Sequence, residues 1–273
     1  MLRFRLLTSS IRIFPEFIII GGQRCGSTSL YYYLAEYPSI VPAMIKEVHY
    51  FDTTNHRKGM KWYRAHFPSL PYMKLITCLN KRQQSYSITG EATPYYMFHP
   101  SVPERIKEAF PSVKLIAILR NPVDRAYSHY YHTVRHGEEH LSFEDAIQQE
   151  TERLQGEFEK FLQDDSYYSF NHQRFSYLSR GIYVEQLKRW WRYFPREQLL
   201  ILKSEDFFDD SSGVLRKVLA FLGLPDTGWE VKVKTRCQAG RYPKMNPSTK
   251  KYLLEYFEPY NQELYELTGI RFD

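Results

Sequence analysis

The segment from Phe17 to Leu34, FIIIGGQRCGSTSLYYYL, carries residue types that bind negative charge. An apolar run ends in glycines, and hydroxyl residues follow at the start of an expected helix. Backbone N–H groups at a helix N-terminus and the helix dipole together favour an anion. Arg24 adds a fixed positive charge. The segment therefore predicts a loop that holds a phosphate group, with a glycine-rich turn that binds nothing as the alternative.

This loop departs from the loop that binds ATP. Gly21 and Gly26 fit the first part of the G-x-x-x-x-G-K-[ST] pattern, but Ser27 stands where the lysine belongs. The apolar run Lys114–Leu119 ends in Arg120 and offers no acidic partner for magnesium. The sequence therefore favours a phosphate site without Mg-ATP chemistry, and a P-loop kinase or NTPase is the alternative. No metal site is expected, because no cluster of residues has metal-ligand spacing.

A second anion site is predicted in KLIAILRNPVDRAYSHY. Arg120 follows the apolar run, and Ser128 lies about two turns into the next helix, so the two can hold a phosphate by charge-assisted hydrogen bonds. Because Arg125 is close to Ser128 on the same helix, one of the two arginines is expected to face outward. An arginine that pairs with Asp124 is the alternative. Two such sites predict a ligand with two separate phosphates.

The elements that must position these residues follow an α/β pattern. Strand-like runs alternate with helical patterns, which predicts a single domain over residues 1–273 with a central parallel sheet flanked by helices. Residues 55–87 are expected to be loops with one short helix at Trp62–His66. The other expected elements are strands at Phe17–Ile20, Lys114–Leu119 and Gln198–Leu202, and helices at Ser27–Glu36, after the cap Asn121, after the cap Ser142, in GIYVEQLKRWWRYF, in SSGVLRKVLAFL before Gly223, and at Pro247–Leu267.

The net charge limits the classes of partner, and the cysteine content limits the cellular compartment. The net charge of +6 favours anionic partners, which leaves nucleic acid, an acidic membrane face and a multiply charged small molecule open. Three cysteines without metal or disulfide spacing favour a reducing, cytoplasmic location. The longest N-terminal apolar run, Phe17–Ile20, is too short for a membrane span or a signal sequence. Arg3, Arg5 and Arg12 leave a mitochondrial or membrane-surface alternative, but no membrane partner is expected.

The order of the motifs resembles a known family, the sulfotransferases that use 3′-phosphoadenosine 5′-phosphosulfate (PAPS). The resemblance is closer to the heparan sulfate N- and 3-O-sulfotransferase branch and its bacterial relatives, and it covers nearly the whole chain. Besides the two phosphate motifs, it rests on KEVHYFD (Lys46 to Asp52), GEATPYYMFHPSVPERIKEAF, RGIYVEQLKRWWRYFP and AGRYPKMNPSTKKYLLEYF. It implies the sulfotransferase fold, in which a P-loop-like strand–loop–helix binds the nucleotide, with PAPS as donor and PAP as product.

The resemblance also implies roles for particular residues. Glu47 corresponds to the catalytic base, with Arg24 and His49 in the same catalytic group and His49 as the alternative base. Because arginine cannot give up a proton, Arg24 in place of the usual lysine implies a purely electrostatic role. The residues that the resemblance assigns to the nucleotide are Gln23, Arg24, Cys25, Gly26, Ser27 and Thr28 for the 5′-phosphosulfate, Arg120 and Ser128 for the 3′-phosphate, and Gly240 and Arg241 in a late closing loop. Those expected to bind the acceptor are Lys46, Asp52, Glu91 and Tyr95.

Two further departures bear on the acceptor. Ala92 stands where many polysaccharide-modifying members have a lysine, and Cys237 has no visible partner for the disulfide of those members. They favour sulfuryl transfer to a hydroxyl or amine of a small molecule, by in-line displacement with Glu47 as general base. A carbohydrate acceptor is the alternative.

A non-enzymatic binder of nucleic acid or polyanions is supported by charge alone. Basic and aromatic residues do interleave in EQLKRWWRYFPRE, as they do on some nucleic-acid surfaces. Their helical spacing nevertheless predicts that Leu187, Trp190 and Phe194 pack into the core, so no nucleic-acid partner is expected. The oligomeric state is left open.

Overall fold

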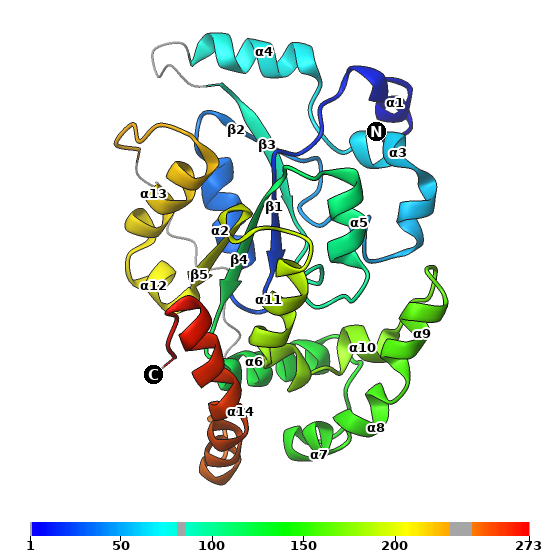
Figure 1. The fold of residues 1–273 in the computed structure, drawn as a ribbon, viewed down its shortest axis with the longest axis vertical. Coiled ribbons are helices and arrows are strands. Elements are labelled where there is room, and N and C mark those ends of the chain that lie inside the picture. Colours follow the sequence, from blue (N-terminus) through cyan, green and yellow to red (C-terminus); the bar gives the residue numbers. More distant parts are fainter. Residues whose placement is uncertain (1, 81–85, 230–241, 273) are drawn as a thin grey trace.

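A five-stranded sheet forms the centre of the computed structural model, which describes residues 2–80, 86–229 and 242–272. All four strand pairings are parallel, in the order β2-β3-β1-β4-β5 (Figure 1). The predicted parallel sheet is confirmed. The strands are β1 (Phe17–Gly21), β2 (Ile40–Pro42), β3 (Ile88–Ala92), β4 (Lys114–Leu119) and β5 (Leu199–Lys203).

The central strand β1 is covered on both faces. Its side chains alternate, so that Ile18 and Ile20 join one core cluster while Phe17 and Ile19 join the other. All five of its residues are buried. Parallel strands buried on both faces are commonly near-continuous apolar runs, so the strand Phe17–Ile20 could be predicted from the sequence.

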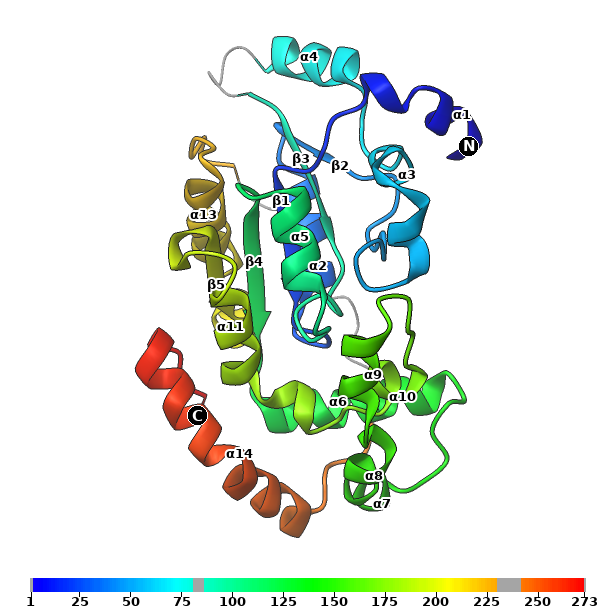
Figure 2. The same ribbon diagram turned by 45° about the vertical axis from the view of Figure 1, so that its right-hand side comes forward.

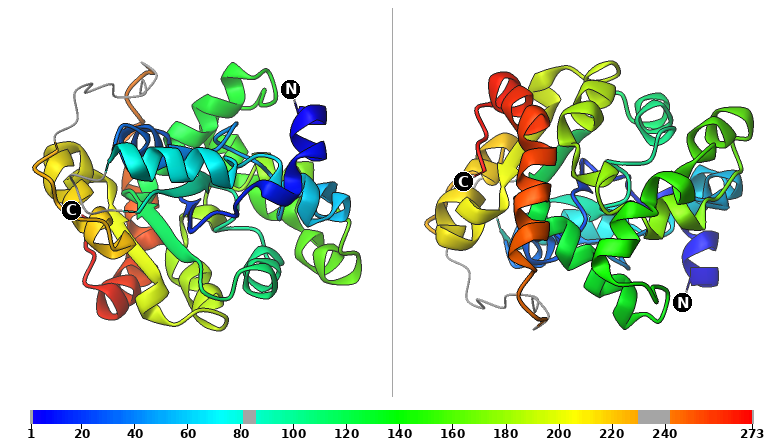
Figure 3. Two further views of the ribbon diagram at one scale, coloured as in Figure 1. Left: turned by 90° about the horizontal axis from the view of Figure 1, so that it is seen from above. Right: turned by 90° about the horizontal axis from the view of Figure 1, so that it is seen from below.

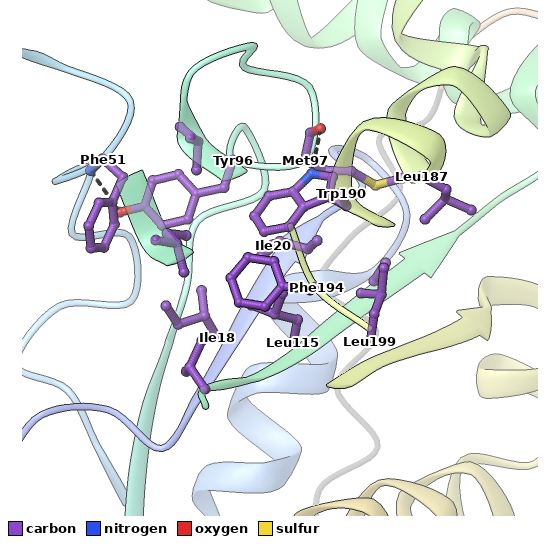
Figure 4. Packing of buried hydrophobic residues seen from close by; sticks show 14 of the residues in the cluster. Ile18, Ile20, Phe51, Tyr96, Met97, Leu115, Leu187, Trp190, Phe194 and Leu199 are labelled. Atoms are coloured by element: carbon purple, nitrogen blue, oxygen red, sulfur yellow. Dashed lines mark hydrogen bonds between the residues drawn. The ribbon is translucent and has the colours of Figure 1, made fainter. Parts of the chain in front are cut away.

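One face of the sheet carries α5 (Val102–Ala109), α11 (Tyr183–Trp191) and the C-terminal part of α14 (Pro247–Thr268). Leu187, Trp190 and Phe194 are buried here, as predicted (Figure 4). The Trp190 indole N–H donates to the Met97 carbonyl over 3.0 Å, so the polar atom of this large side chain is satisfied inside the core.

The other face carries α2 (Ser27–Ala35), α12 (Ser204–Asp209) and α13 (Ser211–Leu222). Gly223 ends α13 with a φ of 78°, the left-handed conformation that glycine adopts without strain. This helix stop was predicted from the sequence.

A group of helices lies at the carboxyl edge of the sheet (Figures 1 and 2). The longest of them, α6 (Pro122–Arg135), begins at the predicted cap Asn121, whose side chain accepts the Val123 N–H. The predicted cap Ser142 also holds, although the helix after it is split into two short pieces. The shorter helices of the group are α7 (Phe143–Gln148), α8 (Glu150–Leu154), α9 (Glu157–Gln163) and α10 (Phe170–Arg174).

The opposite end of the molecule holds α1 (Leu2–Leu7), α3 (Met60–Arg64) and α4 (Leu70–Leu79), as Figures 1 and 2 show. The expectation of loops over residues 55–87 is therefore wrong for α4, and β2 and β3 were not predicted. Short 3₁₀ helices complete the chain at η1 (Ser9–Ile11), η2 (Thr54–Lys58), η4 (Ser179–Gly181) and η5 (Arg196–Gln198). Within the described ranges, no helix is long and apolar enough to cross a membrane.

Candidate active site

A cleft of about 530 Å³ opens where the strands end. The chain leaving β1, β3, β4 and β5 contributes to its walls, because the carboxyl ends of parallel strands meet at one edge of a sheet. The residues that line it are Gln23, Arg24, Gly26, Ser27, Thr28, Ser29, Lys46, Glu47, His49, Pro94, Tyr95, Arg120, Ser128, His132, Gln173, Arg174, Arg180, Ser204 and Phe208.

The loop between β1 and α2 turns sharply. Arg24 and Gly26 have φ values of 65° and 101°, and a Cβ atom on Gly26 would lie 3.0 Å from the Phe208 ring. Glycine is therefore required at this position by both the backbone conformation and the available space. The turn brings Ser27 and Thr28, at the start of α2, to the wall of the cleft.

The two predicted phosphate sites meet in this cleft. The Arg24 Nε donates to the Ser128 Oγ over 3.1 Å, and an Arg120 guanidinium nitrogen donates to the Arg24 carbonyl over 3.4 Å. Burial, followed by the nearby charge of Arg135, lowers the pKa of Arg24. Because these like charges repel one another, an anion bound between them would be favoured.

The expectation that an arginine faces outward is wrong. Arg125 is fully buried and donates to the carbonyl of Tyr177. Arg120, by contrast, lines the cleft. The helical spacing was read correctly, but the cluster of helices at the carboxyl edge covers the side that the sequence suggested was exposed.

A continuous chain of polar contacts runs from the glycine loop to the KEVHYFD segment. The Lys46 Nζ donates to the Thr28 Oγ1 over 2.7 Å and lies 2.5 Å from a Glu47 carboxylate oxygen. The His49 ring bridges Glu47 (3.2 Å) and Asp52 (2.7 Å) through its two nitrogens. The lysine that is missing at Ser27 in the loop is thus supplied from a distant segment.

The neighbouring groups favour the deprotonated form of Glu47 and the protonated form of His49. Burial alone would raise the pKa of Glu47, but the hydrogen bond from His49 and the charge of Lys46 outweigh it and lower the pKa to about 2. Burial likewise opposes the charge on His49, yet Asp52 and Glu47 raise its pKa to about 10. At neutral pH, Glu47 is a carboxylate and His49 is an imidazolium. Glu47 is 37% exposed, so a ligand in the cleft can reach it.

Arg180 is a cleft residue that the sequence analysis did not single out. It is buried, its guanidinium donates to the Gln23 side chain and to the His172 and Gln173 carbonyls, and it stacks over the Tyr95 ring at 5.0 Å. Burial lowers its pKa to about 9. The only signal in the sequence was its place at the start of RGIYVEQLKRWW, beside a predicted helix.

The other expected site residues divide into two groups. Gln23, Lys46 and Tyr95 line the cleft as expected. The side chains of Cys25, Asp52 and Glu91 are buried and do not line the cleft. Their placement therefore does not support direct contact between these side chains and a ligand. Cys25 turns inward to the Tyr183 hydroxyl, and Asp52 turns to His49. Gly240 and Arg241 lie outside the described residues.

Glu91 lies on β3 at the centre of a buried polar network. Its carboxylate accepts hydrogen bonds from the Tyr63 hydroxyl (2.6 Å), the Thr93 hydroxyl (2.8 Å) and the Val48 backbone N–H (3.2 Å). Val48 follows Glu47 directly, so the network ties the sheet to the segment that carries Glu47 and His49.

Potential metal ligands do not cluster in the described part of the chain. No group of three or more His, Cys, Asp or Glu side chains in that part is placed to hold a metal ion. The cations of the cleft are instead the side chains of Arg24, Lys46, Arg120, Arg174 and Arg180. These cations and the backbone N–H groups at the start of α2 are groups that favour an anion in the cleft.

Comparison with known proteins gives consistent similarities. The sulfotransferase domain family model matches residues 14–256. The membrane-associated sulfotransferase kil1 of Dictyostelium discoideum is 29% identical over 93% of this chain and 65% of that protein. The heparan sulfate glucosamine 3-O-sulfotransferase 5 of Mus musculus is 30% identical over 93% of this chain and 72% of that protein. A crystal structure of a sulfotransferase from Alicyclobacillus acidocaldarius superposes with a TM-score of 0.68 at 30% identity, covering 95% of this chain and 98% of the other.

Proposed function

The chain belongs to the sulfotransferase domain family, and we propose that it transfers a sulfuryl group from PAPS to an acceptor held in the cleft described above. The observation that carries this proposal is the convergence of two phosphate-binding elements on one cleft that also holds Glu47. PAPS has phosphate groups at two separate positions and supplies the sulfuryl group. The two elements supply the matching cations.

The glycine loop and the start of α2 suit the 5′-phosphosulfate. Arg24, the hydroxyls of Ser27 and Thr28, and the backbone N–H groups at the start of α2 can neutralise charge that builds on the leaving phosphate. Arg120 and Ser128 suit the 3′-phosphate. Arg24 contacts Ser128 directly, so a ligand that orders one phosphate site also orders the other.

Glu47 is the proposed general base. It is ionised and accessible, whereas the imidazolium of His49 has no free lone pair to take a proton. The low pKa of Glu47 makes it a weak base while Lys46 is paired with it. Lys46 also contacts Thr28 of the donor site, so donor binding that draws Lys46 away would raise the pKa of Glu47 when it is needed.

The proposed acceptor is a small molecule with a hydroxyl or amine. Among the described residues that line the cleft, Glu47 is the only acidic one, so it can take one proton during attack. A carbohydrate is a second candidate, because the mouse relative is a heparan sulfate glucosamine 3-O-sulfotransferase and Arg174 and Arg180 add positive charge beyond the proposed phosphate sites. That charge would suit an anionic sugar.

Transfer of label from PAPS labelled in its sulfuryl group tests the proposal. The protein is incubated with labelled PAPS and a panel of alcohols, amines and sulfated oligosaccharides, in parallel with γ-labelled ATP and magnesium. Label passing from PAPS to an acceptor supports the proposal, and the acceptor that is labelled fastest decides between the two candidates. If label passes to an acceptor only from ATP, the protein is a kinase and the proposal is wrong.

The location in the cell is a further proposal. Cys25 and Cys78 are free thiols, which supports the reducing cytoplasm expected from the sequence. Cell fractionation with an antibody against the chain checks it. Recovery in a secretory fraction would contradict it.

A further inference from the structure

The helix α4 turns an apolar face outward. Of its ten residues only Met73 is buried, while Leu75 and Leu79 are 53% and 71% exposed. Tyr72 lies on the same face, three residues before Leu75, and is also exposed. A surface helix ordinarily turns its apolar stripe to the core and its polar residues to water. The outward apolar stripe of α4 therefore calls for a partner that removes it from water.

The helix α1 extends this face. Phe4 and Leu7 are exposed. Arg5 of α1 donates to the Ala65 carbonyl (2.6 Å), and the Ile13 N–H donates to the Pro68 carbonyl (3.1 Å), so the N-terminal segment is held to the chain that joins α3 to α4. Figures 1, 2 and 3 show both helices at the same end of the molecule. The exposed apolar side chains of the α1–α4 surface are Phe4, Leu7, Ile11, Leu70, Tyr72, Leu75 and Leu79.

The two stretches of chain that form the α1–α4 surface carry charges of one sign. Residues 2–15 and 53–80 contain no Asp or Glu. Arg3, Lys61 and Lys74 among their cations are exposed. The full set of cations in the two stretches is Arg3, Arg5, Arg12, Arg57, Lys58, Lys61, Arg64 and Lys74. An apolar face bordered by cations is the pattern of a segment that lies in the interface of an anionic bilayer.

We propose that the α1–α4 surface docks on an anionic lipid bilayer, with its apolar side chains at the level of the headgroups and Arg3, Lys61 and Lys74 near lipid phosphates. This proposal differs from the expectation, based on the sequence, that the protein has no membrane partner. A second copy of the chain fits less well, since a symmetric contact through this surface would bring like charges together. The cleft lies at the carboxyl edge of the sheet, away from α4, so it stays open in the docked protein.

Sedimentation with vesicles tests the proposal. The whole chain is mixed with phosphatidylcholine vesicles, with and without phosphatidylglycerol, at low and high sodium chloride. We expect sedimentation with the phosphatidylglycerol vesicles and its loss at high salt. The double variant Leu75→Ser, Leu79→Ser should reduce vesicle binding by about tenfold or more. Leu162→Ser on α9 is the matched control, because Leu162 is 70% exposed and Leu79 is 71% exposed.

Charge is tested separately. Lys74→Glu should weaken binding to phosphatidylglycerol vesicles, whereas Lys251→Glu on α14, an exposed lysine far along the chain, should not. PAP binding by each variant, followed by calorimetry, confirms that the variants are folded. Equal binding by wild type and both α4 variants, or equal loss in the two control variants, would overturn the proposal.

A probe on the surface itself reports insertion directly. Cys78 is exposed on α4 and Cys25 is buried, so a fluorophore sensitive to polarity can be attached to Cys78 in a Cys237→Ser background. We expect its emission to shift to shorter wavelength with phosphatidylglycerol vesicles.

Light scattering of the protein without lipid measures its oligomeric state. A dimer that the double variant converts to monomer, with no emission shift on vesicles, would show that a second copy covers the surface.

Discussion

Glu47 and His49 lie in contact, and their neighbours assign them opposite protonation states. Replacing Glu47 by glutamine keeps the shape of the side chain and removes its basicity. We expect Glu47→Gln to lower turnover by about 10²–10⁴-fold, the usual contribution of a general base. PAP affinity should change little, because the proposed nucleotide contacts come from the glycine loop, Arg120 and Ser128.

Steady-state kinetics together with calorimetry of PAP binding checks this prediction. Glu185→Gln is the matched control, since Glu185 is also paired with a neighbouring lysine, Lys188, but lies on the outer side of α11. Loss of both turnover and PAP binding in Glu47→Gln would mean that Glu47 holds the site together and takes no proton.

The pH profile separates Glu47 from His49 as the base. The pKa of Glu47 is lowered to about 2, so the carboxylate is present throughout the neutral range, and the pKa of His49 is raised to about 10, so the imidazolium is present below that pH and lost above it. We expect kcat/KM for PAPS, which reports the enzyme free of donor, to be level between about pH 4 and pH 9. A rise in kcat/KM with an inflection near pH 6.5 would instead identify an unpaired histidine as the base.

Arg120 tests the proposed 3′-phosphate site. Arg120→Ala should weaken PAP binding by about 1.5–3 kcal/mol, the range for a hydrogen bond to a charged group. Arg216→Ala is the control, because Arg216 is exposed on α13 and lies outside the cleft. Calorimetry that gives the same PAP affinity for Arg120→Ala and wild type would contradict the assignment of this site.

The sequence predicted some of these residues and missed others for a physical reason. Arg24 and Arg120 closely follow recognisable strand ends, and Ser128 lies on the helix that follows the second of them, so their chemistry could be inferred locally. Arg180 and the contact of Lys46 with Thr28 depend on segments that meet only in the folded chain. The roles expected of Glu47 and His49 came from the family resemblance, because an isolated KEVHYFD gives no reason to expect burial.

At the scale of elements, β1 and β4 could be recognised from their local sequence, whereas β2 and β3 could not. The runs Phe17–Ile20 and Leu115–Leu119 are apolar at every position, so β1 and β4 were predicted. The strand β2 has only three residues, and β3 reads ITGEA, which has a glycine and a glutamate where an apolar run is expected. The glutamate is Glu91, which is tolerated in the sheet because donors surround its carboxylate.

The network around Glu91 predicts a pH-dependent stability. Burial raises the pKa of Glu91 from 4.5 to about 7, so folding favours the protonated form. The stability that this gives is complete below about pH 4.5 and is lost as the pH rises to about 7. Glu91→Gln cannot ionise, so the stability advantage of wild type over the variant should shrink by roughly 3 kcal/mol across this range.

Urea denaturation of both proteins at a series of pH values measures that difference, and contributions from all other groups cancel in it. Glu91→Gln should also lower turnover more than PAP affinity, because Val48 loses part of its anchor beside Glu47. Glu16→Gln is the control for turnover alone, since Glu16 also accepts a backbone N–H, that of Thr89, and burial also raises its pKa to about 7, but it lies at the amino ends of the strands, away from Glu47. An unchanged difference between wild type and Glu91→Gln at all pH values would show that the Glu91 carboxylate is not buried in its protonated form.

At the scale of the whole molecule, the net charge of +6 combines two separate basic regions. One is the cleft at the carboxyl edge of the sheet, and the other is the acid-free α1–α4 end. The composition gives only the total charge and cannot locate these two regions. For this reason the sequence alone did not decide whether the anionic partner is a nucleotide, a membrane or a nucleic acid. The fold assigns the cleft to a small anionic ligand, because glycine, hydroxyl and arginine groups converge there.

Ligand-dependent unfolding of the whole chain tests this division. PAP that binds only the folded state stabilises it by about 2.7 kcal/mol at a hundredfold excess over Kd, which for a chain of this size raises Tm by about 5 °C or more. The shift should be the same with chelator as with magnesium, because the cations that we propose for the two phosphates are Arg24 and Arg120. It should shrink in Arg120→Ala and persist in the Leu75→Ser, Leu79→Ser variant, whose altered surface lies at the other end. A shift produced by Mg-ATP and abolished by chelator would restore the kinase alternative, and a shift lost in the α4 variant would show that the two ends are not independent.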